Sequence, residues 1–192
     1  MNAIRSFIAI EVPLPLQARM GELQQELKRL AGDIKWVRPG GIHLTLKFLG
    51  TVPKEILEKI ALAVSPVISS KEPFDLRIYG LGCFPSSRNP RVLWLGLDRG
   101  SEQVSSLQET IEKKTAAISL PSERRPFRPH LTIGRIRSLK GKGALAQAIE
   151  IDQNIEIGAF QAKEVILFQS ELTPAGAVHT KLKIFPMGAY HV

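Results

Sequence analysis

Two short segments of the chain share residues whose types and spacing could perform chemistry. His43-Leu44-Thr45-Leu46 returns 87 residues later as His130-Leu131-Thr132-Ile133, and each copy follows an arginine and a proline. Alternation of polar and apolar residues is typical of a β-strand, in which successive side chains point to opposite faces. We therefore expect two strands that each bury their aliphatic residues and present a His and a Thr together on the other face.

Two histidines flanked by threonines fit acid–base chemistry on a phosphodiester. Imidazole titrates near neutral pH, so one ring can be neutral and remove a proton while the other is charged and donates one. Threonine hydroxyls can donate hydrogen bonds to oxygens that gain charge in the transition state. In-line displacement at phosphorus needs these two proton transfers on opposite sides. The candidate catalytic residues are His43, Thr45, His130 and Thr132.

Other kinds of chemistry fit the sequence less well. Zinc sites usually combine three or four His, Cys or carboxylate ligands at short spacing, and the chain contains neither His-Glu-x-x-His nor His-x-His. A Gly-x-x-x-x-Gly-Lys-Ser/Thr phosphate loop is also absent from the sequence. We expect no metal and no cofactor. A non-catalytic module that binds RNA or nucleotides with the same fold is the alternative.

The composition favours a globular protein with an anionic partner. Hydrophobic residues make up 44% of the 192-residue chain and charged residues 23%, with a formal net charge of +8. A basic charge balance does not by itself locate a site. The single cysteine, Cys83, excludes an intrachain disulfide, fits a reducing compartment and is expected to be a small buried hydrophobe. No apolar run reaches the roughly 18 residues needed to cross a bilayer, so we expect a soluble, cytoplasmic protein. We also expect a monomer.

The elements that position the two motifs are predicted from hydrophobic periodicity. The expected helices cover residues 16–30, 54–64, 101–118 and 144–149, and the expected strands cover 6–10, 34–37, 43–49, 74–81, 91–97, 130–136, 164–172 and 178–185. The repeat indicates an internal duplication. We expect an α+β fold of two pseudo-symmetric lobes, each with an antiparallel-rich sheet and outer helices, in one domain over residues 1–192. The site would lie in the central cleft.

The double motif in its context resembles the 2H phosphoesterase superfamily, and within it the bacterial and archaeal RNA 2′,3′-cyclic phosphodiesterases, formerly called 2′-5′ RNA ligases. Segments 7–10, 43–50 and 130–135 and the final two strands carry the resemblance. It implies metal-independent hydrolysis of 2′,3′-cyclic phosphates, on RNA ends or small cyclic nucleotides, to 2′-phosphomonoesters. The same site allows reversible 2′-5′ ligation. The implied roles are His43 as general acid toward the 3′ oxygen, His130 as general base for water, and Thr45 and Thr132 on the nonbridging oxygens.

Further residues are candidates for substrate binding. The resemblance suggests Arg135 as a phosphate ligand, but strict alternation places it on the face of Leu131, so its use requires a bulge or twist near Gly134. Phe48 meets the same difficulty, and we expect it to be a core residue first and a base-stacking surface second. Arg38, Arg125, Phe127, Arg128 and the loop over residues 84–91 are candidate RNA contacts. His179 and His191 are expected to be surface histidines.

Overall fold

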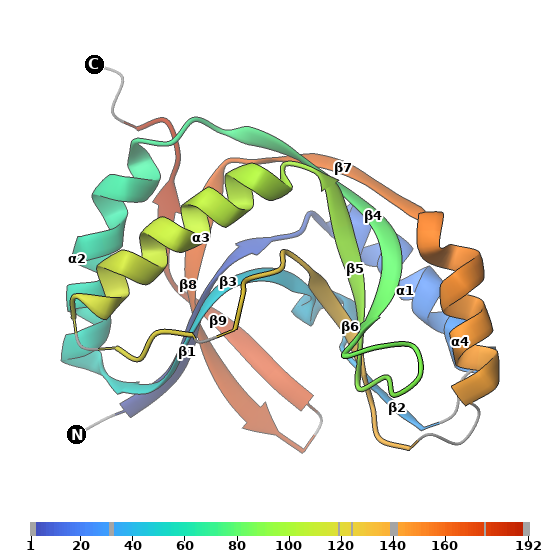
Figure 1. Ribbon diagram of the computed structural model, residues 1–192. Coiled ribbons are helices and arrows are strands. Elements are labelled where there is room, and N and C mark those ends of the chain that lie inside the picture. Colours follow the sequence, from blue (N-terminus) through green and yellow to red (C-terminus); the bar gives the residue numbers. More distant parts are fainter. Residues whose placement is uncertain are drawn as a thin grey trace.

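In the part of the chain that the structure describes, nine strands form one antiparallel sheet, which curls into an arch in the computed structural model (Figure 1). The structure describes residues 3–30, 33–118, 120–123, 125–138, 142–174 and 176–189. The strands are β1 (Ala3–Glu11), β2 (Ile34–Trp36), β3 (His43–Pro53), β4 (Phe74–Phe84), β5 (Val92–Arg99), β6 (Leu131–Ile136), β7 (Glu156–Ala162), β8 (Glu164–Thr173) and β9 (Gly176–Pro186). The helices are α1 (Leu14–Leu30), α2 (Lys54–Ser69), α3 (Ser101–Ala116) and α4 (Lys142–Ile151), with 3₁₀ turns η1 (Pro39–Gly41) and η2 (Asp152–Asn154).

The two motif strands are neighbours at the centre of this sheet. The strand order is β7-β4-β5-β6-β3-β1-β8-β9, and β2 adds to the free edge of β6. β3 and β6 run antiparallel with Leu44 opposite Leu131. Outward from this pair, β1, β8 and β9 on one side correspond to β5, β4 and β7 on the other. The expected pseudo-twofold relation between the two halves is therefore present, and its axis passes between the two motifs.

The two lobes exchange helices. α2 and α3 lie outside the arm formed by β3, β1, β8 and β9, whereas α1 and α4 lie outside the other arm (Figure 1). α1 follows β1 in sequence but contacts β7 and α4, and α3 belongs to the second repeat but contacts β3 and α2. Each lobe is thus built from both halves of the chain, a detail that the repeat alone did not predict.

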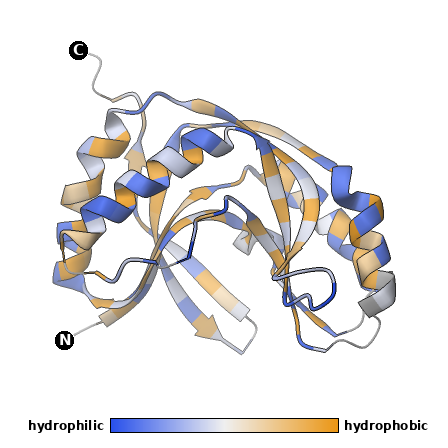
Figure 2. Cartoon of the chain, viewed as in Figure 1, coloured by the Kyte–Doolittle hydropathy of each residue, from blue (hydrophilic) through white to orange (hydrophobic). Residues whose placement is uncertain are grey.

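The helices bury their apolar faces against the outer face of the sheet. In α1, apolar residues at three- and four-residue spacing place Met20, Leu23 and Leu27 on one buried side, and Figure 2 shows the same alternation of colour around the other helices. A second, smaller cluster lies on the inner face of the arch and consists of Phe7, Ala9, Ile166 and Phe168. β1 is therefore buried on both faces.

Most of the predicted elements are present, with differences in their bounds: β1 begins at Ala3 instead of residue 6, and α2 continues to Ser69 instead of ending at residue 64. The strand expected to end at residue 49 continues to Pro53, and Gly50 within it adopts a left-handed φ of 74°. β4 extends to Phe84, and β7 was not predicted. None of the helices in the described residues has the length and hydropathy that crossing a bilayer requires.

Candidate active site

A β-bulge follows Thr45 directly in the first motif strand. Ala9 of β1 lies opposite Thr45 and Ile8 lies opposite Lys47, so Leu46 has no partner in the ladder. One extra residue reverses the face on which later side chains lie. Lys47 consequently points toward the helices and is 5% exposed, whereas Phe48 joins the inner face and is 65% exposed. The expectation that Phe48 is first a core residue is wrong.

The second motif strand contains the same irregularity at the same position of the repeat. Trp94 of β5 lies opposite Thr132 and Leu93 lies opposite Gly134, so Ile133 is the unpaired residue. Arg135 is thereby exposed on the face of Thr132. The bulge that its use requires is confirmed. Gly134 is suited to it because a Cβ there would lie 2.8 Å from Cγ2 of Ile34.

A glutamine of α1 supports the bulge in β6. Gln24 is 2% exposed, and its Nε2 donates hydrogen bonds to the carbonyl oxygens of Val37 at 2.7 Å and Ile133 at 2.8 Å. The backbone N–H of Val37 also donates to Ile133 at 3.0 Å. Buried carbonyl groups need such partners where the ladder is interrupted. The carbonyl oxygen of the unpaired Ile133 therefore accepts two hydrogen bonds, which hold β6 in its bulged form.

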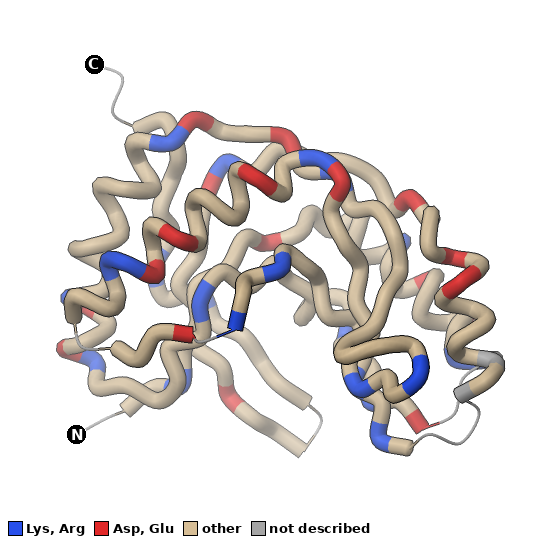
Figure 3. Tube along the Cα trace, viewed as in Figure 1, with Lys and Arg blue, Asp and Glu red and all other residues tan. Residues whose placement is uncertain are grey.

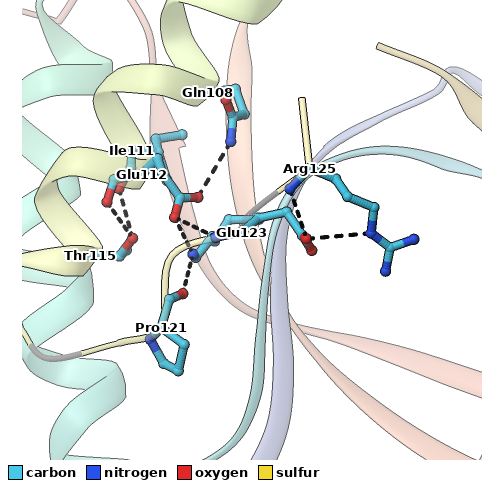
Figure 4. Close-up of polar contacts among 8 residues, drawn as sticks. Gln108, Ile111, Glu112, Thr115, Pro121, Glu123 and Arg125 are labelled. Carbon is cyan, nitrogen blue, oxygen red and sulfur yellow. Dashed lines mark hydrogen bonds and ion pairs between the residues drawn. The ribbon is translucent and has the colours of Figure 1, made fainter. Parts of the chain in front are cut away.

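A buried ion pair supports the bulge in β3. Nζ of Lys47 lies 2.6 Å from Oε1 of Glu112 on α3 and donates to the carbonyl oxygen of Pro121 at 2.8 Å. Oε1 of Glu112 also accepts the backbone N–H of Glu123 at 3.1 Å. Figure 4 shows this network around Glu112. It joins the first motif strand to the segment that leads into His130.

The His43 ring belongs to an aromatic cluster on the inner face. It stacks on Phe7, with ring centroids 4.4 Å apart and planes at 20°. Phe7 also contacts Phe168 at 5.1 Å and Phe48 at 6.2 Å. His179 of β9 meets the His43 ring edge-on at 5.2 Å. The expectation that His179 is an ordinary surface histidine is therefore wrong; His191 lies outside the described residues.

This environment keeps His43 neutral in the free protein. Burial is the main reason that the pKa of His43 falls from 6.5 to about 4, and the nearby charge of His179 lowers it further. A hydrogen bond with the backbone of Gly41 acts in the opposite direction. Gly41 precedes His43 by two residues, so the turn that begins the strand also orients the ring.

The His130 ring is oriented in the same way by the backbone two residues earlier. Its Nδ1 donates to the carbonyl oxygen of Arg128 at 2.6 Å. Because a carbonyl oxygen only accepts, the proton of the neutral ring lies on Nδ1 and Nε2 keeps its lone pair. Phe84 meets the ring edge-on at 5.1 Å and Trp94 at 6.5 Å.

The register brings the two motifs together. Leu44 and Leu131 are opposite each other and buried against the helices, so the residues on either side of them lie on the inner face. In an antiparallel pair this register carries His43 toward Thr132 and Thr45 toward His130. The four side chains, all half-buried, form two crossed His–Thr pairs that could bind one phosphate between them.

The other residues predicted to bind substrate differ in how far they are exposed. Arg38, Arg125 and Arg128 are exposed, and Arg125 lies 3.7 Å from Glu123. Phe127 is half-buried and packs against the hydrophobic core. Figure 3 shows basic residues along the segment between α3 and β6 and on the β4–β5 loop. α3 contains three acidic residues, whereas α4 contains one, Glu150. The open side of the arch is thus bordered by positive charge.

Three contributors to the site were not predicted individually. Phe7 lies in an apolar run that does not reveal which residue faces inward. Trp94 lies opposite Thr132, and the signal for it is Gly82 on the neighbouring strand, where a Cβ would come within 2.4 Å of the indole ring. Gln24 resembles any polar residue of an amphipathic helix. Among the described residues, no group of three His, Cys, Asp or Glu side chains is arranged to hold a metal ion.

Two His–Thr strands paired at the centre of a curled antiparallel sheet define a two-histidine phosphoesterase. The family described as LigT-like phosphoesterase matches the chain twice, over residues 10–94 and 95–179. The chain therefore belongs to the LigT-like phosphoesterases, and the resemblance to the 2H superfamily is confirmed.

Curated relatives cover nearly the whole chain. The RNA 2′,3′-cyclic phosphodiesterase of Methanothermobacter thermautotrophicus is 36% identical over 182 residues, which cover 95% of this chain and 98% of the relative. The protein of the same name from Methanocaldococcus jannaschii is 31% identical, with 94% of this chain and 99% of the relative covered.

Solved structures share the fold. A protein of Thermus thermophilus aligns with a TM-score of 0.79 at 28% identity, covering 97% of this chain and 100% of its own. Escherichia coli LigT complexed with 3′-AMP also has a TM-score of 0.79, at 23% identity, with 96% of this chain and 98% of that chain covered.

Proposed function

We propose that this chain is an RNA 2′,3′-cyclic phosphodiesterase that hydrolyses cyclic phosphate ends to 2′-phosphomonoesters. The observation that carries the proposal is the central pairing of the two motif strands, with both imidazoles oriented by backbone groups two residues earlier. Two proton-transfer groups on one face of a sheet are more than binding alone requires. The names of the curated relatives support the same activity.

The proposed reaction moves two protons. Nε2 of His130 removes a proton from water as the water oxygen bonds to phosphorus, and the bond from phosphorus to the 3′ oxygen breaks on the opposite side. His43 donates a proton to that leaving oxygen. Thr45 and Thr132 donate hydrogen bonds to the nonbridging oxygens, which gain charge in the transition state. No metal takes part in these steps.

The role of His43 as general acid requires the substrate itself. The ring is neutral at neutral pH in the free protein because its pKa is about 4. A cyclic phosphate diester carries a negative charge, and an anion close to an imidazole raises its pKa. Substrate binding would therefore load the proton that His43 later donates.

Substrate contacts are proposed on both sides of the phosphate. The exposed ring of Phe48 would stack against the base of the terminal nucleotide, as aromatic side chains commonly do with single-stranded RNA. Arg135 would bind the phosphate from the face of Thr132. Arg38 and Arg128 would contact the RNA backbone beyond the terminal nucleotide. We also propose that the chain acts as a monomeric single domain, since one chain supplies both motifs, and that it works in the cytoplasm, which its single cysteine fits.

One assay tests this proposal directly. Purified protein is incubated in EDTA with RNA that ends in a 2′,3′-cyclic phosphate, and the position of the product phosphate is determined. We expect a 2′-phosphomonoester, and we expect His43→Ala or His130→Ala to lower kcat by about 10²- to 10⁴-fold. Tight binding of the RNA end without turnover, indifferent to both substitutions, would instead support a non-catalytic binding module. Activity that is lost in EDTA and restored by Zn²⁺ or Mn²⁺ would refute the metal-independent mechanism.

A further inference from the structure

A third histidine lies within the aromatic cluster that holds His43. His179 is edge-on to His43 at 5.2 Å and to Phe7 at 5.0 Å, with interplanar angles of 88° and 83°. A Cβ placed on Gly41 would lie 3.8 Å from Cδ2 and 3.9 Å from Nε2 of His179. The ring of His179 therefore lies against the same residue whose backbone orients His43.

The arrangement confines the His43 ring on two sides. Phe7 stacks on one face of the imidazole, and the ring of His179, perpendicular to it, closes a second side. Nδ1 of His179 is buried and has no hydrogen-bond partner among the described residues. A histidine placed only for stability would be expected to use that nitrogen.

We infer that His179 is a positioning residue for the proposed reaction, which holds the His43 ring against Phe7 and competes with it for a single proton. Two imidazoles this close favour a state in which only one of them is charged. His179 thereby adds to burial in lowering the pKa of His43, and an anionic phosphate would act in the opposite direction. The inference rests on the proposed function and adds a third titrating group to it.

The surroundings of His179 are consistent with this competition. The charged or titratable groups that act on the ring are His43 on β3 and Arg5 on β1. Lys181 is two residues further along β9. Glu11 is paired with Lys181, and Ser170, opposite His179 on β8, is neutral. Burial lowers the pKa of His179, and the charge of Arg5 lowers it further. Both rings are thus biased toward the neutral form before substrate binds.

Two substitutions separate the ring contact from the charge. His179→Phe keeps an aromatic ring against His43 but cannot titrate, and His179→Ala removes both the ring and the charge. Thr180→Ala, at the exposed neighbouring position of β9, is the matched control. We expect His179→Ala to lower kcat about 10-fold with a smaller change in KM, because His43 loses its orientation. His179→Phe should restore most of that loss.

The effect of the charge on His179 is measured by the titration of His43. NMR titration of the ring protons, without substrate, should show the pKa of His43 rising by about half a unit or more in His179→Phe and unchanged in Thr180→Ala. In the pH profile of kcat/KM, the limb that reports His43 should move upward in His179→Phe. A pKa for His43 that is the same in wild type and His179→Phe, with superimposable pH profiles, would overturn the inference.

The NMR titration does not depend on catalysis, so the two proposals can fail separately. A wild-type protein that does not hydrolyse the cyclic phosphate refutes the proposed function, whereas the response of His43 to substitution of His179 still decides the competition for the proton. If His43 is the general acid, the alkaline limb is the one that moves. Movement of the acidic limb would support the inference about His179 and overturn the assignment of His43 as acid.

Discussion

Phe48 and Arg135 reach the inner face because each motif strand has an extra residue directly after its Thr. Leu46 and Ile133 are the unpaired residues, one position after each Thr. The consequence is the same in both halves. Positions that regular alternation would bury beneath the sheet become the exposed borders of the proposed phosphate site.

Phe48→Ala should weaken substrate binding with little effect on folding. The ring is 65% exposed, so the free energy of unfolding should change by less than about 0.5 kcal/mol. Loss of one base stack costs about 1–3 kcal/mol, which corresponds to a rise in KM of about 5-fold or more. Steady-state kinetics on a cyclic-phosphate RNA measure this, with Phe48→Tyr as the control that retains stacking. An unchanged KM would show that the base binds elsewhere.

The low pKa of His43 should make folding sensitive to acid. The folded ring binds a proton only near pH 4, whereas the ordinary value is 6.5, so the unfolded chain takes up a proton first as pH falls below about 6.5. Stability is therefore complete at neutral pH and decreases toward pH 4. Between pH 7.5 and 5 the free energy of unfolding should fall by about 2 kcal/mol from this group. Urea unfolding at both pH values measures it, and a His43→Asn variant with the same decrease would contradict the assignment.

Strand alternation was sufficient to nominate His43, Thr45, His130 and Thr132, because these four residues precede the bulges. The same argument failed for Phe48, since a bulge arises from pairing with a neighbouring strand and is not encoded in local periodicity. His179 was missed for a similar reason. Its strand, β9, is distant in sequence from both motifs, and only the order β3-β1-β8-β9 brings its ring to His43.

At the scale of elements, the first helix of each half of the chain supports one of the two bulges. α1 does so through Gln24, a neutral side chain that satisfies carbonyl groups. α3 does so through Glu112, which binds the ammonium group of Lys47. α1 and α3 thus have equivalent roles in the two halves, but they support the bulges with different side-chain interactions.

Gln24→Leu should destabilise the protein and displace Arg135. The substitution leaves the carbonyl of Val37 without its donor and removes one of two from Ile133, at a cost of about 1–3 kcal/mol. Chemical denaturation measures this change, and a reduced kcat/KM reports the altered strand. Gln25→Leu, at the exposed neighbouring position of α1, is the control. Equal stability of the two variants would contradict the supporting role of Gln24.

Lys47→Met should destabilise the protein by leaving the carboxylate of Glu112 without its positively charged partner. The Lys47 side chain is 4% exposed and that of Glu112 is 18% exposed, and an unpaired buried charge is expected to cost about 2–3 kcal/mol here. The double variant Lys47→Met, Glu112→Gln should recover part of this loss, because the remaining charge is then removed. Additive effects of the two substitutions in a double-mutant cycle would argue against coupling between β3 and α3.

At the scale of the whole molecule, the exchange of helices joins the two arms into one folding unit. We expect a single cooperative transition on heating. Both tryptophans, Trp36 and Trp94, lie on strands of the arm that contains β2, β4, β5, β6 and β7, so their fluorescence reports that arm, while far-UV circular dichroism reports all helices. Coincident transitions by the two methods are expected. Two separate transitions would mean that the arms fold as independent domains.

The overall class was predictable because a duplicated motif implies duplicated structure. Two lobes, outer helices and strands for both motifs followed from the repeat and the periodicity. Strand β7 could not be predicted in this way, because its residues show only weak alternation and include Gly158 at a φ of 140°. The exchange of helices also could not be predicted, because each helix has one apolar stripe that fits either arm equally well in sequence.

The exchanged helices bear on how such an arch could have originated. Neither half of the chain holds a complete lobe, so a single half would expose apolar helix and strand faces. Two identical halves related by a twofold axis could cover those faces by exchanging helices, and their two identical His–Thr strands would meet at the axis. Fusion of such a swapped homodimer would produce the present architecture, in which the two motif strands of a single chain meet at the former symmetry axis and form the proposed active site.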